Sequence, residues 1–167
     1  MIAALDVAYG PRGAATACVL FQAFADARPA SSHVTHLAQV EPYEPGSFYK
    51  RELPCLLAAL AAAPVAPSIV IVDGYVWLSA DRRPGLGARL HEALGGHVVV
   101  VGVAKTGFAG SAFAEAVLRG TSAKPLYVTA AGAEASVAAG WIRSMHGPHR
   151  LPTLLQRADR MCKDAAG

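Results

Sequence analysis

The run of residues 68–74, Ser-Ile-Val-Ile-Val-Asp-Gly, constrains the fold of this chain most strongly. Four consecutive β-branched residues lie between a serine and the pair Asp73-Gly74. A short, continuous apolar run with such flanks is typical of a strand that is buried on both faces of a parallel sheet. Sheets of this kind build their sites beyond the carboxyl ends of their strands. The run therefore predicts a central strand whose last residue, Asp73, faces a functional site.

The N-terminal residues repeat this arrangement. Residues 2–9 are apolar with an embedded aspartate, Asp6, and Gly10-Pro11 follow them. Two aspartates on two central strands predict a shared acidic site.

Turn residues divide the rest of the chain into short elements. Clusters of glycine and proline bound further predicted strands at residues 14–24, 33–40, 97–103, 117–119 and 126–129. Predicted helices cover residues 54–63, 84–94, 133–145 and 151–164. The first of these helices is placed with Pro54 at its first position, which leaves Glu52 just before it.

The order of these elements predicts the fold class. Three antiparallel strands followed by helix, strand, helix and strand predict an α/β fold with a mixed sheet of five core strands flanked by helices. With aspartates ending the first and fourth strands, this order resembles the ribonuclease-H-like arrangement.

Composition narrows the possible classes of protein. The 167 residues, 53% of them apolar, predict one domain spanning residues 1–167. Cys18, Cys55 and Cys162 form no CxxC pair and are interpreted as buried, reduced thiols. Together with an N-terminus that lacks the pattern of a signal peptide, they predict a cytoplasmic protein. No uninterrupted apolar stretch approaches transmembrane length, so no membrane contact is expected. The net charge of +3 is compatible with nucleic acid but does not argue for it.

Four segments resemble the endonuclease V family, in the family's order and with similar spacing. They are residues 5–9 (LDVAY), 42–52 (PYEPGSFYKRE), 71–74 (IVDG) and 101–106 (VGVAKT). The second is the most specific, because it is similar to the family's PYIPG…FRE block. Residues 124–129 and 150–152 also match, so the resemblance spans nearly the whole chain.

The resemblance implies a metal-dependent endonuclease of the DNA repair type. Such enzymes cut a phosphodiester bond slightly 3′ of a deaminated purine, chiefly inosine, in DNA or RNA. Carried over by position, the metal carboxylates are Asp6, Glu52 and Asp73, and Lys105 contacts phosphate or supports the site. Tyr43 lies in the wedge that separates the lesion from its partner base. The residues expected to contact nucleic acid are Tyr43, Pro45, Gly46, Arg51 and Gly74.

The chemistry explains these residue types. Hydrolysis of a phosphodiester needs charge neutralisation at the phosphate and a hydroxide near pH 7, and Mg²⁺ held by carboxylates supplies both. Hard oxygen ligands favour Mg²⁺, with Mn²⁺ as a substitute, over zinc. Glu134, at the start of a predicted helix, is a candidate for a fourth metal carboxylate.

Several departures from the family keep other interpretations open. Glu44 stands where the family has an apolar residue, and Tyr75-Val-Trp77 replaces a glycine and a His-Pro pair. The metal centre is therefore expected to be retained while the recognition surface is altered. One alternative is a nucleic-acid-binding module on the same fold that does not cleave. Another is a nuclease with a different nucleic-acid substrate. The protein is expected to be a monomer.

Overall fold

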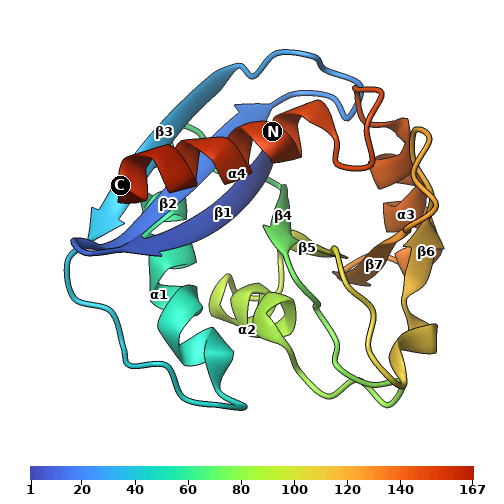
Figure 1. Ribbon diagram of the computed structural model, residues 1–167, viewed down its shortest axis with the longest axis horizontal. Coiled ribbons are helices and arrows are strands. Elements are labelled where there is room, and N and C mark those ends of the chain that lie inside the picture. Colours follow the sequence, from blue (N-terminus) through green and yellow to red (C-terminus); the bar gives the residue numbers. More distant parts are fainter.

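One mixed sheet of seven strands organises the chain in the computed structural model, which describes residues 1–167 (Figure 1). The strands lie side by side in the order β3-β2-β1-β4-β5-β7-β6. Their bounds are β1 Ile2–Gly10, β2 Gly13–Phe21, β3 Ser31–Leu37, β4 Ile69–Asp73, β5 Val99–Ala104, β6 Glu115–Val117 and β7 Leu126–Ala131.

Parallel pairing is confined to the centre of the sheet. β4 runs parallel to both β1 and β5, with Leu5 opposite Val72 and Asp73 opposite Val103. All other pairs are antiparallel. The uninterrupted β-branched run of β4 fits this central position, because Val70, Ile71 and Val72 are all buried.

Helices cover both faces of the sheet (Figure 1). The helices α3 (Ala135–Ser144) and α4 (Thr153–Ala166) enclose one hydrophobic cluster, which includes Ile71, Ile142 and Leu154. The helices α1 (Phe48–Ala61) and α2 (Leu86–Ala93) enclose the other, which includes Leu56 and Leu90. The sheet is therefore the middle layer of three.

The predicted fold class is confirmed, since the five strands β3-β2-β1-β4-β5 form the expected core and helices flank it. β7 and β6 extend this core by two antiparallel strands beyond β5. The three cysteines are free and buried, as predicted. None of the helices combines the length and the apolar character that crossing a membrane requires.

The position of the first helix was predicted wrongly. It begins at Phe48 rather than Pro54, so Glu52 lies inside the helix and Pro54 is an internal residue. Proline costs a helix the hydrogen bond of its missing N–H. Here the continued helix buries Cys55, Leu56 and Ala59 against the sheet, which offsets that loss. The other predicted elements end within a few residues of their observed bounds, since ends are the least constrained part of an element.

Candidate active site

The alternation of side chains along the central strands brings three predicted site residues to one face. Ile71 on β4 and Val101 and Val103 on β5 belong to the cluster under α3 and α4. Side chains two residues apart share a face, so Asp73 and Lys105 point to the same side as these residues. Asp6 follows Ala4, which lies in the same cluster. Asp73 ends β4 and Lys105 directly follows β5, whereas Asp6 lies in the middle of β1 and does not end the first strand as predicted. It comes directly after Leu5, the last residue of β1 that pairs with β4. Two carboxylates and an ammonium group thus gather where the parallel pairing of the central strands ends.

Lys105 connects these strand ends to α4. Its Nζ lies 3.2 Å from Asp73 Oδ2 and 3.6 Å from Asp159 Oδ1. Asp159 is held a second time by Lys163, 2.9 Å away and one helical turn further along. Although burial raises it, the pKa of Asp159 is lowered overall by the hydrogen bond from Lys163 and the charge of Lys105. The site therefore carries a carboxylate from the last helix that stays ionised.

Two carboxyl groups of the site are energetically unfavourable as anions. Burial and the neighbouring charge of Asp73 raise the pKa of Asp6 to about 7. Burial and the charge of Asp6 raise the pKa of Glu52 to about 8. Glu52 is only 7% exposed, and its Oε2 atom is buried without any hydrogen-bond partner. These values describe buried carboxyl groups whose negative charge Lys105 and Arg51 balance only in part.

This donor set fits a hard divalent cation. The available ligands are carboxylate oxygens, which Mg²⁺ and Mn²⁺ prefer. The unpartnered Oε2 of Glu52 and the raised pKa of Asp6 are both relieved by a positive charge placed between them. However, no three His, Cys, Asp or Glu side chains are grouped closely enough to hold one ion as they stand. Glu52 reaches the site from α1, on the opposite face of the sheet from Asp6 and Asp73, and this explains the wider spacing.

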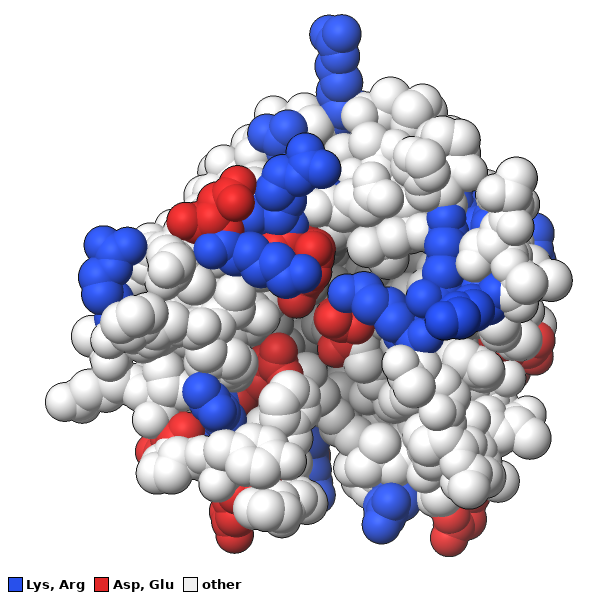
Figure 2. All heavy atoms as spheres, viewed as in Figure 1, with Lys and Arg blue, Asp and Glu red and all other residues white.

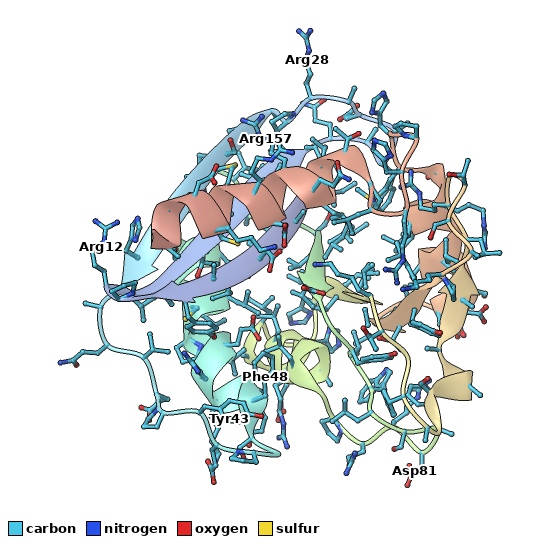
Figure 3. The ribbon with its side chains drawn as sticks, in the orientation of Figure 1. Arg12, Arg28, Tyr43, Phe48, Asp81 and Arg157 are labelled. Atoms are coloured by element: carbon cyan, nitrogen blue, oxygen red, sulfur yellow. The ribbon has the colours of Figure 1, made fainter.

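The remaining predicted contacts lie around a groove that begins at Asp73. Gly46 and Gly74 both line this groove, and both have positive φ angles, 80° and 117°, which favour glycine. Tyr43 is 62% exposed on the turn that precedes α1, and Pro45 is exposed on the same turn. Figure 3 shows Tyr43 and Phe48 at the side of the molecule away from α4. The groove is thus bordered by the segment that sequence analysis assigned to the wedge.

Arg51 is packed rather than extended into solvent. Its guanidinium carbon lies 3.8 Å from the centroid of the Tyr9 ring, and its Nε atom is buried without an acceptor. Its charge lowers the pKa of neighbouring Glu52, against the larger opposing effects of burial and Asp6. This geometry supports an electrostatic role at Glu52.

Glu134 lies away from the other carboxylates, contrary to the prediction of a fourth ligand. It immediately precedes α3, just after β7 ends at Ala131. Ala131 lies opposite Val100, near the start of β5, whereas Lys105 follows the end of β5. Because β7 runs antiparallel to β5, the carboxyl end of β7 lies beside the amino end of β5. Glu134 and Asp73 are therefore at opposite ends of the strands.

Asp159 is the site residue that sequence reasoning missed. In the sequence, Asp159 stands among the basic residues Arg157, Arg160 and Lys163, so it is not part of an acidic cluster. A local signal does exist, because Asp159 follows Leu155 by one helical turn and Leu155 packs against the core. An acidic residue at the edge of the buried stripe of a basic helix could have been noticed.

Acidic and basic side chains are segregated on one face of the molecule. Figure 2 shows acidic side chains in a hollow at the middle of one face, with lysine and arginine side chains on several sides of it. A positive rim around an acidic centre attracts a phosphate backbone and directs it towards the centre.

Comparison with known proteins gives a consistent result. A sequence model of the Endonuclease V family matches residues 1–135. The endonuclease V of Xylella fastidiosa strain Temecula1 is 33% identical over 96% of this chain and 75% of its own length. That of Streptomyces coelicolor is 31% identical over 98% of this chain and 78% of its own length.

Solved structures agree in fold. The endonuclease V of Streptomyces avermitilis is 27% identical and superposes with a TM-score of 0.72, covering 98% of this chain and 80% of that one. The Ciona intestinalis endonuclease V, crystallised with a DNA 23-mer that contains inosine followed by a ribo-adenosine, is 18% identical with a TM-score of 0.80, covering 99% of this chain and 84% of that one. The match over most of the sequence, together with the shared fold, shows that this chain belongs to the endonuclease V family of nucleases.

Proposed function

We propose that the protein is a Mg²⁺-dependent endonuclease that hydrolyses the phosphodiester bond 3′ to a deaminated purine, chiefly inosine, in DNA or RNA. The observation that carries the proposal is that Asp6 and Glu52 are buried with strongly raised pKa values, partly because of the charge of Asp73, which Lys105 contacts at 3.2 Å. The inosine-containing DNA bound by the Ciona intestinalis relative supports the substrate. A role in DNA repair follows from that substrate.

Asp6, Glu52 and Asp73 would hold the metal ion, with Asp159 close enough to support it through Lys105. The bound ion supplies a water molecule of lowered pKa and neutralises charge on the phosphate. Mn²⁺ would substitute for Mg²⁺, because it accepts the same oxygen ligands.

Lys105 would contact the phosphate, and Asp159 would position Lys105. Lys105 presents its ammonium group at the strand ends, where it can donate to an oxygen of the scissile phosphate. The charge of Asp73, together with those of Asp6 and Asp159, raises the pKa of Lys105 despite its partial burial, so Lys105 stays protonated. Asp159 holds Lys105 in position through the 3.6 Å ion pair.

The turn before α1 supplies the means to open a base pair. Tyr43 is exposed, and Pro42 and Pro45 on either side restrict its backbone. A stiff turn loses less conformational entropy when its aromatic side chain inserts between bases. Extruding a base costs least where it is mispaired, so inosine is favoured over normal purines.

Cleavage assays with labelled oligonucleotides test this proposal. Inosine-containing and matched adenine-containing strands, as DNA and as RNA, are incubated with Mg²⁺, with Mn²⁺ and with chelator. Wild-type protein is expected to cut near inosine only with metal, and Asp73→Asn to lower kcat by at least about 100-fold. Metal-dependent cutting without inosine preference would retain the nuclease and reject the lesion specificity.

One observation favours a second candidate, a nucleic-acid-binding module that does not cleave. The three carboxylates are not grouped closely enough to hold one ion without movement. In that case the folded protein would bind the oligonucleotides but would not cut them with either Mg²⁺ or Mn²⁺. Addition of Mg²⁺ would also leave its Tm unchanged, whereas a resident metal ion raises the Tm of the native state.

A further inference from the structure

The largest groove of the molecule, about 540 Å³, begins at Asp73 and runs away from α4. Phe48 and Tyr49 of α1 form one wall. Tyr75 and the start of α2 form the other. This volume accommodates a nucleotide, and aromatic walls suit a planar base.

Arg89 of α2 lines this groove and has no carboxylate partner for its charge. Its guanidinium carbon lies 4.8 Å from the centroid of the Tyr49 ring, and its Nε atom is buried. The side chain of Arg89 makes no hydrogen bond. It also takes part in none of the four ion pairs of the structure, in all of which the cation is a lysine. The buried Nε atom and the contact with the Tyr49 ring hold the guanidinium of Arg89 in place. Its two terminal nitrogens remain free to donate hydrogen bonds.

The position of the groove indicates which part of a nucleic acid reaches Arg89. Asp73 belongs both to the carboxylate site and to the lining of the groove, so a strand whose phosphate lies at the carboxylates can turn its adjacent base into the groove. Arg83, also in the lining and without an ion pair, adds positive charge. No acidic side chain other than Asp73 lines the groove. The occupant must therefore present hydrogen-bond acceptors.

Purines differ in this respect. An arginine fork pairs with the O6 and N7 acceptors of a 6-oxopurine, whereas adenine presents an amino group at C6 beside its N7. A donor that is held in place rejects the wrong edge, because that edge would leave buried donors facing each other.

We propose that Arg89 is a specificity-determining residue that donates to the O6 and N7 edge of an extruded 6-oxopurine in this groove. The proposal rests on the proposed function in that the base belongs to the nucleotide beside the cleavage site. It assigns recognition of the deaminated base to a side chain of α2 and leaves phosphate attraction to Lys105.

Binding measurements separate this proposal from cleavage. Fluorescence anisotropy in Ca²⁺ gives the Kd of wild-type protein, Arg89→Gln and Arg89→Lys for otherwise identical single strands that carry inosine, adenine or 7-deazainosine. Wild type is expected to prefer inosine over adenine, and both variants to lose roughly 10- to 100-fold of that preference. Arg89→Lys keeps the positive charge, so a loss of inosine preference in this variant reports the loss of the bidentate hydrogen-bond geometry alone.

A double-mutant cycle that combines Arg89→Gln with 7-deazainosine tests the hydrogen bond between Arg89 and N7. Replacing N7 by carbon is expected to weaken binding to wild type, and to have little further effect on Arg89→Gln, because the same hydrogen bond is already absent. Arg28→Gln, on an exposed loop at the edge of the molecule in Figure 3, is the charge-matched control and should keep the wild-type preference.

Several outcomes would overturn the proposal. An equal loss of affinity for inosine and adenine in Arg89→Gln would make Arg89 a phosphate contact. Additive effects of the variant and of 7-deazainosine, or no inosine preference in wild-type protein, would also reject it. Failure to cleave with any metal, together with an inosine preference that depends on Arg89, would reject the proposed nuclease function and leave this assignment standing. Far-UV circular dichroism confirms that each variant is folded.

Discussion

Asp6 and Glu52 make stability depend on pH when no divalent cation is present. Their pKa values of about 7 and about 8 in the fold exceed the ordinary values of 3.8 and 4.5. The folded state therefore holds more protons than the unfolded chain between pH 4 and 8, and the free energy of unfolding falls as pH rises through this window. In chelator, we expect a decrease of several kcal/mol from this pair, since each pKa unit corresponds to about 1.4 kcal/mol, measured by urea unfolding at a series of pH values.

Asp6→Asn isolates this effect. It removes the titration of Asp6 and the charge that raises the pKa of Glu52, so the slope of stability against pH should become shallower. Glu115→Gln, at an exposed position on β6, should leave the slope unchanged. Equal slopes in wild type and Asp6→Asn would show that the two carboxyl groups do not titrate as the structure indicates.

Mg²⁺ should oppose this loss of stability above pH 7. Metal ligands must be ionised to bind, so the increase in Tm produced by Mg²⁺ is expected to be larger at pH 8 than at pH 6. At a tenfold excess over its Kd, the ion stabilises the fold by about 1.4 kcal/mol. Differential scanning fluorimetry with and without Mg²⁺ measures the shift, and Asp73→Asn should reduce it. An increase that is the same at both pH values would argue against ligands with raised pKa values.

At the scale of elements, Arg119 fixes the connection between α3 and α4. Arg119 is only 7% exposed, and its guanidinium donates to the carbonyl groups of Met145, Gly147, His149 and Arg150. Arg119→Met leaves these acceptors without their donor, and we expect a loss of about 2–4 kcal/mol in the free energy of unfolding. Arg143→Met, exposed on α3, serves as the control and should change stability by less than about 0.5 kcal/mol. A similar value for both variants would mean that other contacts hold the connection.

β5 can approach the segment after β4 only because residue 102 is glycine. A Cβ atom at Gly102 would lie 2.5 Å from the carbonyl oxygen of Gly74 and 2.8 Å from the amide nitrogen of Val76. Both contacts are with backbone, so Gly102→Ala should displace this segment or lower the free energy of unfolding by about 2 kcal/mol or more. Gly140, inside α3, has open space around it, and Gly140→Ala should stabilise the fold by about 0.5–1 kcal/mol. Chemical denaturation of the two variants gives the comparison, and equal effects would contradict it.

At the scale of the whole molecule, the two hydrophobic clusters share one sheet and should unfold together. Trp141 packs against the cluster under α3 and α4, stacked on Phe24 at 5.1 Å, and Trp77 packs against the other cluster. Trp77→Phe and Trp141→Phe each leave one fluorescent reporter. In both variants, the fluorescence and far-UV circular dichroism curves in urea should coincide, as a single domain requires. Separate transitions within either variant would reject the proposal that residues 1–167 form one domain.

The sequence by itself determined the central strands and the ends of β4 and β5. It did not determine the end of β1, which continues past Asp6 because its antiparallel pairing with β2 extends to Gly10. The apolar run before Asp73 and the patterns around Asp6 and Lys105 are local, because alternation along a strand depends only on neighbouring residues. Parallel pairing of the central strands then brings these three residues to one edge, as expected. The functional roles of these residues stay predictions that the cleavage assays test.

Only the tertiary structure decided which distant residues join that edge. It placed Glu52 within α1, excluded Glu134 because β7 runs antiparallel to β5, and added Asp159 from the last helix. It also formed the groove in which Arg89 of α2 stacks on Tyr49 of α1. Each of these outcomes depends on the direction of a strand or on helices packed across a sheet. Such long-range geometry is fixed by burial of the whole apolar surface, which no local pattern of residues encodes.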